Sequence, residues 1–371
     1  MKGLATGSLN YFPALDGLRA LAVLAVFAEH FTYNEFVRGW GPGTIGVRTF
    51  FVLSGFLITS ILLKEIGTAP VSKLATRFYG RRLLRLAPAF YVAIALAALL
   101  GIAEMRSAWW IHGLYLSNFQ ILLQERWTGA GHFWTLAVEE QFYLLWFPLV
   151  VLAPRRWLLP LVLTCLALAP AFRSLIPMGA SPFINVMLPG QVDSLAAGAL
   201  VALARFRSDL RWLDQIFLSR AWLIVLWTMT LAVSAPLYHK PAFLSWVLLP
   251  SLMSLAAACL VRTCVEGQAT ALRLLCRPAM IWMGKRSYGL YIFHYLVPPF
   301  LFSYIPAIEL LGDGPLKFVR LVIWVVLTLV LAELSWRYVE RPFLRLKDRF
   351  RPEQSGTAGR SMSHDGLPHK L

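Results

Sequence analysis

The chain has 371 residues, of which 58% are hydrophobic and only 15% are charged. This composition excludes an ordinary soluble domain and predicts repeated membrane spans, each of about 20 apolar residues. The net charge of +16 would suit a nucleic-acid binder. The basic residues, however, cluster in short loops between apolar segments and form no stripe interleaved with aromatics, so we expect no nucleic-acid partner.

The hydropathy pattern predicts an all-α polytopic membrane protein with about ten transmembrane helices. The expected spans are 18–35, 43–63, 87–105, 133–153, 157–174, 184–204, 221–237, 242–263, 279–302 and 317–338. Most Lys and Arg residues then lie on one side, which predicts a cytoplasmic N-terminus and C-terminus. The few basic residues expected in outer loops include Arg48 and Arg173.

The segment 109–123 is also apolar enough to span. A span there would move Arg155 and Arg156 to the outside, so we expect a re-entrant or interfacial segment instead. Residues 1–350 are expected to form one membrane domain, and the polar residues 351–371 a disordered cytoplasmic tail. The mostly polar residues 1–17 do not resemble a cleavable signal peptide.

The four cysteines, at positions 165, 259, 264 and 276, lie in or beside apolar segments and lack metal-ligand spacing. Cysteines of this kind usually pack as small hydrophobic residues. We therefore expect no metal site and no disulfide framework. Separately, no bound cofactor is expected.

The first expected span carries Asp16, Arg19 and His30. Arg19 and His30 are eleven positions apart, which places both on one helix face about 16 Å apart. Ionisable groups inside a span are costly and usually face a cavity or a bundle interior. His30 is a candidate general base or transient acyl carrier, and Arg19 would fix an anion or a neighbouring carboxylate. The alternative is a histidine that only satisfies a polar helix–helix contact.

Two further motifs follow along the chain. Ser54 and Gly55 lie in the middle of the second expected span, where a small pair allows close helix packing and Ser54 could hydrogen-bond across the contact. No nucleophile motif surrounds this serine.

Arg82 and Arg85 are three residues apart on one helix face and could hold a phosphate. Their alternative role is to set topology or bind lipid headgroups.

The segment WTLAVEEQFYLLW contains Glu139 and Glu140 in or near a span. An intramembrane carboxylate is a functional candidate by default. Glu139 shares a helix face with Tyr143 and could bind acceptor hydroxyls or orient a histidine. The alternative is a structural pair with an arginine. Asp193 is another intramembrane carboxylate, without an obvious partner.

A last polar face appears in SYGLYIFHYL, where Ser287, Tyr291 and His294 have the spacing i, i+4, i+7. This face could bind substrate, although aromatic residues at such spacing often serve packing alone.

The motifs LDGLRA with the downstream His30, FFVLSGF, RRLLRLAP, WTLAVEEQFYLLW, SYGLYIFH and RYVERPF occur in this order from about residue 15 to residue 343. Together they resemble the membrane-bound acyltransferase-3 family, whose members O-acylate carbohydrates of the cell surface. The resemblance implies that Arg19 and His30 are the catalytic signature, together with Glu139. It also implies that Arg82 and Arg85 contact the phosphates of acyl-CoA. Asp16, Ser54, Ser287, Tyr291 and His294 complete the expected substrate-binding set.

The expected function is therefore transfer of an acyl group, most simply acetyl, from cytoplasmic acyl-CoA to a hydroxyl of a carbohydrate or lipid-linked sugar. The expected location is the inner (plasma) membrane, in contact with its lipids. Direct attack by the acceptor hydroxyl and an acyl-histidine intermediate both remain open. Longer family members carry an extra hydrolase-like domain, and this chain resembles the short form. The rival function is a proton-coupled transporter or flippase of a glycan or lipid precursor, although the internal repeats typical of transporters are not found.

Overall fold

The computed structural model describes residues 11–32, 34–102, 104–175, 182–237, 244–267, 272–305, 307–308 and 316–347. Within these ranges all regular secondary structure is helical, which confirms the all-α fold class for the described part of the chain. The expected tail at 351–371 lies outside the described residues.

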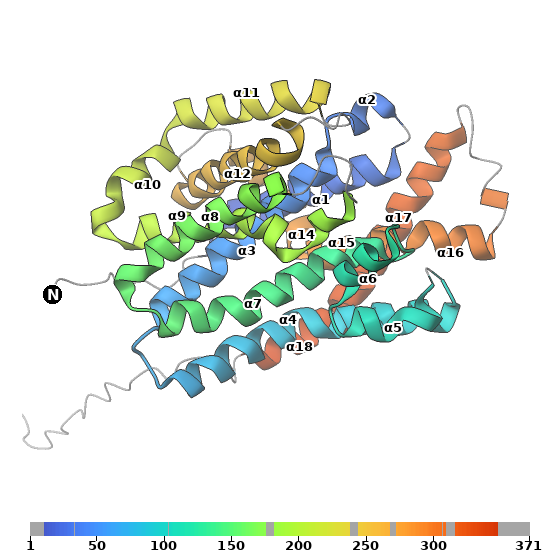
Figure 1. Cartoon of the computed structure of the whole chain (residues 1–371). Coiled ribbons are helices and arrows are strands. Elements are labelled where there is room, and N and C mark those ends of the chain that lie inside the picture. Colours follow the sequence, from blue (N-terminus) through green and yellow to red (C-terminus); the bar gives the residue numbers. More distant parts are fainter. Residues whose placement is uncertain are drawn as a thin grey trace, which may run out of the picture.

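The helices pack side by side as a bundle (Figure 1). The longer ones are α1 (Pro13–Phe31), α3 (Pro42–Glu65), α4 (Val71–Leu100), α7 (Trp134–Leu152), α8 (Leu158–Leu175), α9 (Leu188–Phe206), α11 (Arg220–Leu237), α12 (Leu249–Glu266) and α17 (Lys317–Ser335). The shorter ones are α2 (Glu35–Arg38), α5 (Met105–Gly113), α6 (Ser117–Gln124), α10 (Arg211–Leu218), α13 (Leu272–Leu275), α14 (Pro278–Lys285), α15 (Ser287–His294), α16 (Val297–Tyr304) and α18 (Arg341–Leu346). Single π-helical turns precede α12 (Leu244–Leu248) and α18 (Trp336–Glu340).

Among the described residues, six helical segments are long and apolar enough to cross a membrane, or seven if the bent pair α10–α11 counts as one span. The six contain α3, α4, α7, α8, α12 and α17. The chain is thus a multi-pass membrane protein, as its composition predicts.

The first expected span, 18–35, differs from the helix that forms. α1 begins at Pro13, a residue favoured in a first turn, and ends at Phe31, after which the Thr32 hydroxyl donates a hydrogen bond of 2.5 Å to the Ala28 carbonyl. His30 consequently lies in the last turn of α1, nearer the helix end than the expected bounds placed it. Arg19 remains near the opposite end of the same helix.

One other expected span is broken. The stretch 279–302 forms the three short helices α14, α15 and α16, with interruptions at Arg286 and at Tyr295–Leu296. The stretch 109–123, which was not expected to span, falls within α5 and α6, each too short to do so. Trp109 and Trp110 on α5 are about half exposed, at 55% and 49%.

The expectation that Arg48 and Arg173 lie in outer loops is wrong. Arg48 on α3 and Arg173 on α8 are only 4% and 1% exposed, and both form ion pairs with Asp193 on α9. The hydroxyl of Ser251 on α12 donates a further hydrogen bond of 2.7 Å to this carboxylate. Buried charges are tolerated when they are paired and hydrogen-bonded. This network therefore ties four helices together: α3, α8, α9 and α12.

Candidate functional site

A cavity of about 90 Å³ lies between five helices, α1, α3, α4, α7 and α15. Polar side chains from each helix line it, together with apolar walls that include Phe50 and Leu136. Its polar lining residues are Arg19, Ser54, Arg82, Arg85, Thr135, Glu139, Tyr143, Ser287, Tyr288 and Tyr291. Five segments far apart in the sequence thus supply one polar chamber.

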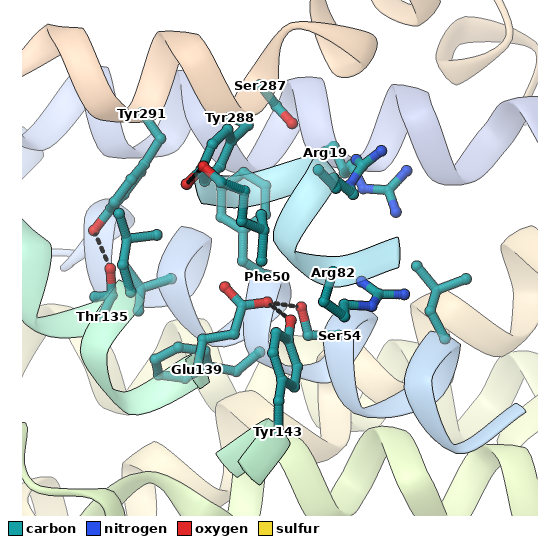
Figure 2. A pocket seen from close by; sticks show the side chains of 16 residues that line it. Arg19, Phe50, Ser54, Arg82, Thr135, Glu139, Tyr143, Ser287, Tyr288 and Tyr291 are labelled. Atoms are coloured by element: carbon teal, nitrogen blue, oxygen red, sulfur yellow. Dashed lines mark hydrogen bonds between the residues drawn. The ribbon is translucent and has the colours of Figure 1, made fainter. Parts of the chain in front are cut away.

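One end of the cavity is cationic. Figure 2 shows Arg19 and Arg82 together on the right of the view. The Arg19 guanidinium donates a hydrogen bond of 2.7 Å to Asp16, whose other oxygen accepts a bond of 2.8 Å from the Tyr11 hydroxyl. Arg82 lies 5.6 Å from the ring centre of Tyr143. Among the described residues no carboxylate forms an ion pair with Arg82 or Arg85, so both can receive an external anion.

The centre of the cavity holds Glu139. The hydroxyls of Ser54 and Tyr143 both donate hydrogen bonds to Oε1 of this carboxylate (Figure 2). Within the described part of the chain, Oε2 has no hydrogen-bond partner. The partners of Glu139 are therefore hydroxyls, rather than the arginine or histidine considered from the sequence. Oε2 is open to interact with a hydroxyl or another donor that enters the cavity.

Tyr291 and Thr135 lie at the opposite end of the cavity, and their hydroxyl oxygens are 2.8 Å apart (Figure 2). The Thr135 hydroxyl also contacts the His132 carbonyl at 3.0 Å. The Tyr291 carbonyl accepts a hydrogen bond of 2.6 Å from Nδ1 of His294, one turn further along. Tyr291 thus connects the cavity to a second polar group.

This second group is a histidine cluster made of His30, His132 and His294. Nε2 of His294 lies 3.0 Å from Nδ1 of His30, and the rings of His132 and His294 are 5.3 Å apart. His132 and His294 are buried, at 4% and 0% exposure, whereas His30 is exposed. Nε2 of His132 donates to the Ile292 carbonyl at 2.9 Å, and its Nδ1 has no partner among the described residues. The cluster therefore combines an accessible imidazole with two buried ones.

The structure brings together most of the residues that the sequence singled out. Arg19, Ser54, Arg82, Arg85, Glu139, Ser287 and Tyr291 line the cavity, and Asp16 holds Arg19. His30 and His294 lie outside the cavity lining and contact each other instead. The sequence analysis missed His132, although it stands only two residues before Trp134, where the motif WTLAVEEQFYLLW begins.

Comparison with known proteins gives a consistent result. A family model described as an acyltransferase domain matches residues 12–336. The chain is 28% identical to "Peptidoglycan O-acetyltransferase OatA" of Listeria monocytogenes serovar 1/2a, and the match covers 92% of this chain and 57% of that protein. It is 29% identical to "Putative O-acetyltransferase" of Staphylococcus aureus (strain COL), covering 90% and 58%.

A third relative, "Putative peptidoglycan O-acetyltransferase YrhL" of Bacillus subtilis (strain 168), is 30% identical, with 90% of this chain and 55% of that protein covered. The chain thus spans little more than half the length of these curated relatives. No solved structure matches the chain.

Proposed function

Because the chain belongs to the acyltransferase-3 family of membrane proteins, we propose that it is an integral-membrane O-acyltransferase. It moves an acyl group, acetyl in the simplest case, from cytoplasmic acyl-CoA to a carbohydrate hydroxyl. The observation that carries this proposal is the cavity itself. At one end it has two guanidinium groups that form no ion pair with a carboxylate of the described residues, and at the other a tyrosine that contacts a histidine cluster.

The cationic end suits the donor. Acyl-CoA carries phosphate groups at one end of a long, thin arm and a thioester at the other. Arg82 and Arg85 can hold phosphate oxygens through paired N–H donors, and Arg19 adds a third guanidinium. With its phosphates bound by these arginines, acyl-CoA would extend its thioester arm along the cavity towards Tyr291 and the histidine cluster. The apolar walls match the uncharged arm.

The histidine cluster suits the chemistry. An alcohol attacks a thioester slowly unless a base removes its proton, and general-base help is typically worth about 10²–10⁴-fold. In the proposed step, Nε2 of His30 takes the proton as the acceptor oxygen bonds to the thioester carbonyl carbon. The C–S bond then breaks, the protonated His30 returns that proton to the sulfur, and CoA leaves as the free thiol. Glu139 Oε2 is placed to bind a hydroxyl in the cavity.

The proposed topology has ten spans, formed by residues 1–350, with both termini in the cytoplasm and the protein in the plasma membrane. Arg19 and His30 then lie near opposite ends of α1, so donor and acceptor approach from opposite faces of the membrane. Two of the relatives carry peptidoglycan in their names. We therefore propose a glycan of the cell surface as the acceptor, either polymeric or lipid-linked.

The test uses the purified full chain in proteoliposomes with [¹⁴C]acetyl-CoA and soluble peptidoglycan fragments. We expect label to appear on the glycan as an ester that mild alkali releases. His30→Ala should lower the rate by about 10²-fold or more, with thermal unfolding like that of the wild type. Absence of transfer to any glycan, with glycan flux across the vesicle membrane instead, would favour the transporter function. A folded His30→Ala variant with normal transfer would remove His30 from the mechanism.

A further inference from the structure

We propose that His294 is a positioning residue. It holds His30 in the neutral tautomer whose accessible nitrogen, Nε2, is unprotonated and can act as a base. This inference rests on the proposed function. It assigns His294 to the orientation of His30 and away from substrate binding, the role expected from the sequence.

The hydrogen bonds of His294 fix where its own proton lies. Nδ1 is 2.6 Å from the Tyr291 carbonyl oxygen, and a carbonyl can only accept, so Nδ1 must carry the proton. In neutral imidazole the other nitrogen is then an acceptor. Nε2 of His294 therefore carries a lone pair, which is directed at the neighbouring side chain.

That neighbour is Nδ1 of His30, at 3.0 Å. Because Nε2 of His294 accepts, Nδ1 of His30 must donate. His30 then keeps its own lone pair on Nε2, the nitrogen remote from His294. His294 is fully buried and His30 is exposed, so the lone pair of His30 belongs to the accessible part of the pair.

The reverse arrangement would require a protonated His294 that donates from both nitrogens. Its surroundings oppose this, because the rings of Phe27 and Phe31 lie 5.6 and 6.0 Å away and the side chain has no solvent contact. A buried cation without a carboxylate partner is costly. Among the described residues, the other titratable groups that face His294 are His30, His132, Tyr291 and Tyr295, none of which carries a negative charge at neutral pH.

Packing fixes the geometry as well as the proton. His294 ends α15, and His30 lies in the last turn of α1. The two rings are 5.1 Å apart, and Tyr295 contacts His30 edge-on, also at 5.1 Å. His30 is thus held by a hydrogen bond on one side and an aromatic ring on another, which limits its rotation.

Two substitutions separate this role from simple packing. His294→Phe keeps a planar ring but removes the acceptor, whereas His294→Gln keeps an oxygen that can accept from Nδ1 of His30. We expect His294→Phe to lower kcat by about 10-fold, the value of one hydrogen bond, with KM for acetyl-CoA unchanged. His294→Gln should recover most of the loss. The matched control is His112→Phe, which replaces another buried histidine on α5, hydrogen-bonded to Ser117.

A second measurement does not depend on activity. In the full chain labelled with ¹⁵N-histidine, and with His30 assigned through His30→Asn, we expect the Nε2 resonance of His30 at neutral pH to be that of an unprotonated nitrogen. In His294→Phe we expect a mixture of tautomers. A protonated Nε2 in the wild type would overturn the proposal. So would equal loss of kcat in the Phe and Gln variants. Absence of glycan acylation with the expected resonance would refute the proposed function alone.

Discussion

Gly55 on α3 and Gly198 on α9 each pack directly against the backbone of the other helix. A Cβ atom on Gly55 would lie 1.9 Å from the Leu195 carbonyl oxygen, and one on Gly198 would lie 2.0 Å from that of Val52. Small residues permit such close approach between membrane helices. The contact fixes α3, and with it Ser54, relative to the rest of the bundle.

Gly198→Ala should therefore destabilise the protein, because backbone rather than a flexible side chain must move. Forcing extra atoms into a packed core typically costs about 1–3 kcal/mol. The measurement is the thermal unfolding midpoint in detergent. Gly113→Ala is the matched control, since its nearest neighbour would be a Tyr91 ring atom at an ordinary 3.6 Å. Equal midpoints for the two variants would contradict the close packing of α3 and α9.

Asp193→Asn should lower the stability of the protein more than Gly198→Ala does. Asp193 accepts from Arg173 at 2.8 Å and from Arg48 at 3.3 Å, so the substitution removes the negative charge that these two buried guanidiniums share. Breaking a buried ion pair costs about 3–5 kcal/mol. The control is Asp209→Asn, which removes an exposed partner of Arg207 and should change the unfolding midpoint little. A similarly small change for Asp193→Asn would show that this network does not hold the four helices together.

The sequence identified most of the cavity because helical spacing places residues on shared faces. Arg82 with Arg85, and Glu139 with Tyr143, could be paired from their spacing alone. Spacing cannot tell which helices adjoin, so the meeting of Ser54 with Glu139, or of His30 with His294, required the fold. His132 was missed because it lies before α7, in the short 3₁₀ turn Gly131–Phe133, where helical periodicity gives no signal.

The hydropathy pattern also gave wrong positions for two buried arginines and missed the interruptions within 279–302. It assigned Arg48 and Arg173 to loops because it cannot anticipate a buried partner such as Asp193. It read 279–302 as one helix because the apolar run continues through the breaks. The consecutive prolines Pro298 and Pro299 were a signal for the start of a new helix, because proline suits a first turn and disrupts an interior.

Replacing both Arg82 and Arg85 by alanine should raise KM for acetyl-CoA. Loss of charge-assisted hydrogen bonds to phosphate is worth about 10- to 100-fold, whereas kcat should change little. The test compares acetyl-CoA with acetyl-pantetheine, a donor without phosphates, whose KM should be the same in both proteins. Arg155 and Arg156, exposed basic residues away from the cavity, provide the control double substitution. An unchanged KM for acetyl-CoA would return Arg82 and Arg85 to a role in topology alone.

Glu139→Gln should lower kcat by about 10- to 100-fold, the value of a charge-assisted hydrogen bond to a bound hydroxyl. The glutamine amide keeps the shape of the side chain but removes its negative charge. The carboxylate oxygen Oε1 accepts hydrogen bonds from Ser54 and Tyr143, whereas Oε2 is the oxygen open to a bound hydroxyl. Tyr143→Phe should have a smaller effect, because Ser54 still donates to the carboxylate. Tyr338→Phe, at a site that is 74% exposed, controls for loss of a tyrosine hydroxyl.

Steady-state kinetics with acceptor and donor varied separately would show where Glu139 acts. A carboxylate that binds the acceptor hydroxyl changes KM for the glycan and kcat, and leaves KM for acetyl-CoA unaltered. Full activity of Glu139→Gln would reduce the hydrogen bonds from Ser54 and Tyr143 to a structural link between α3 and α7. A larger loss in Tyr143→Phe than in Glu139→Gln would instead make the tyrosine hydroxyl, and its contact with Arg82, the functional group of this part of the cavity.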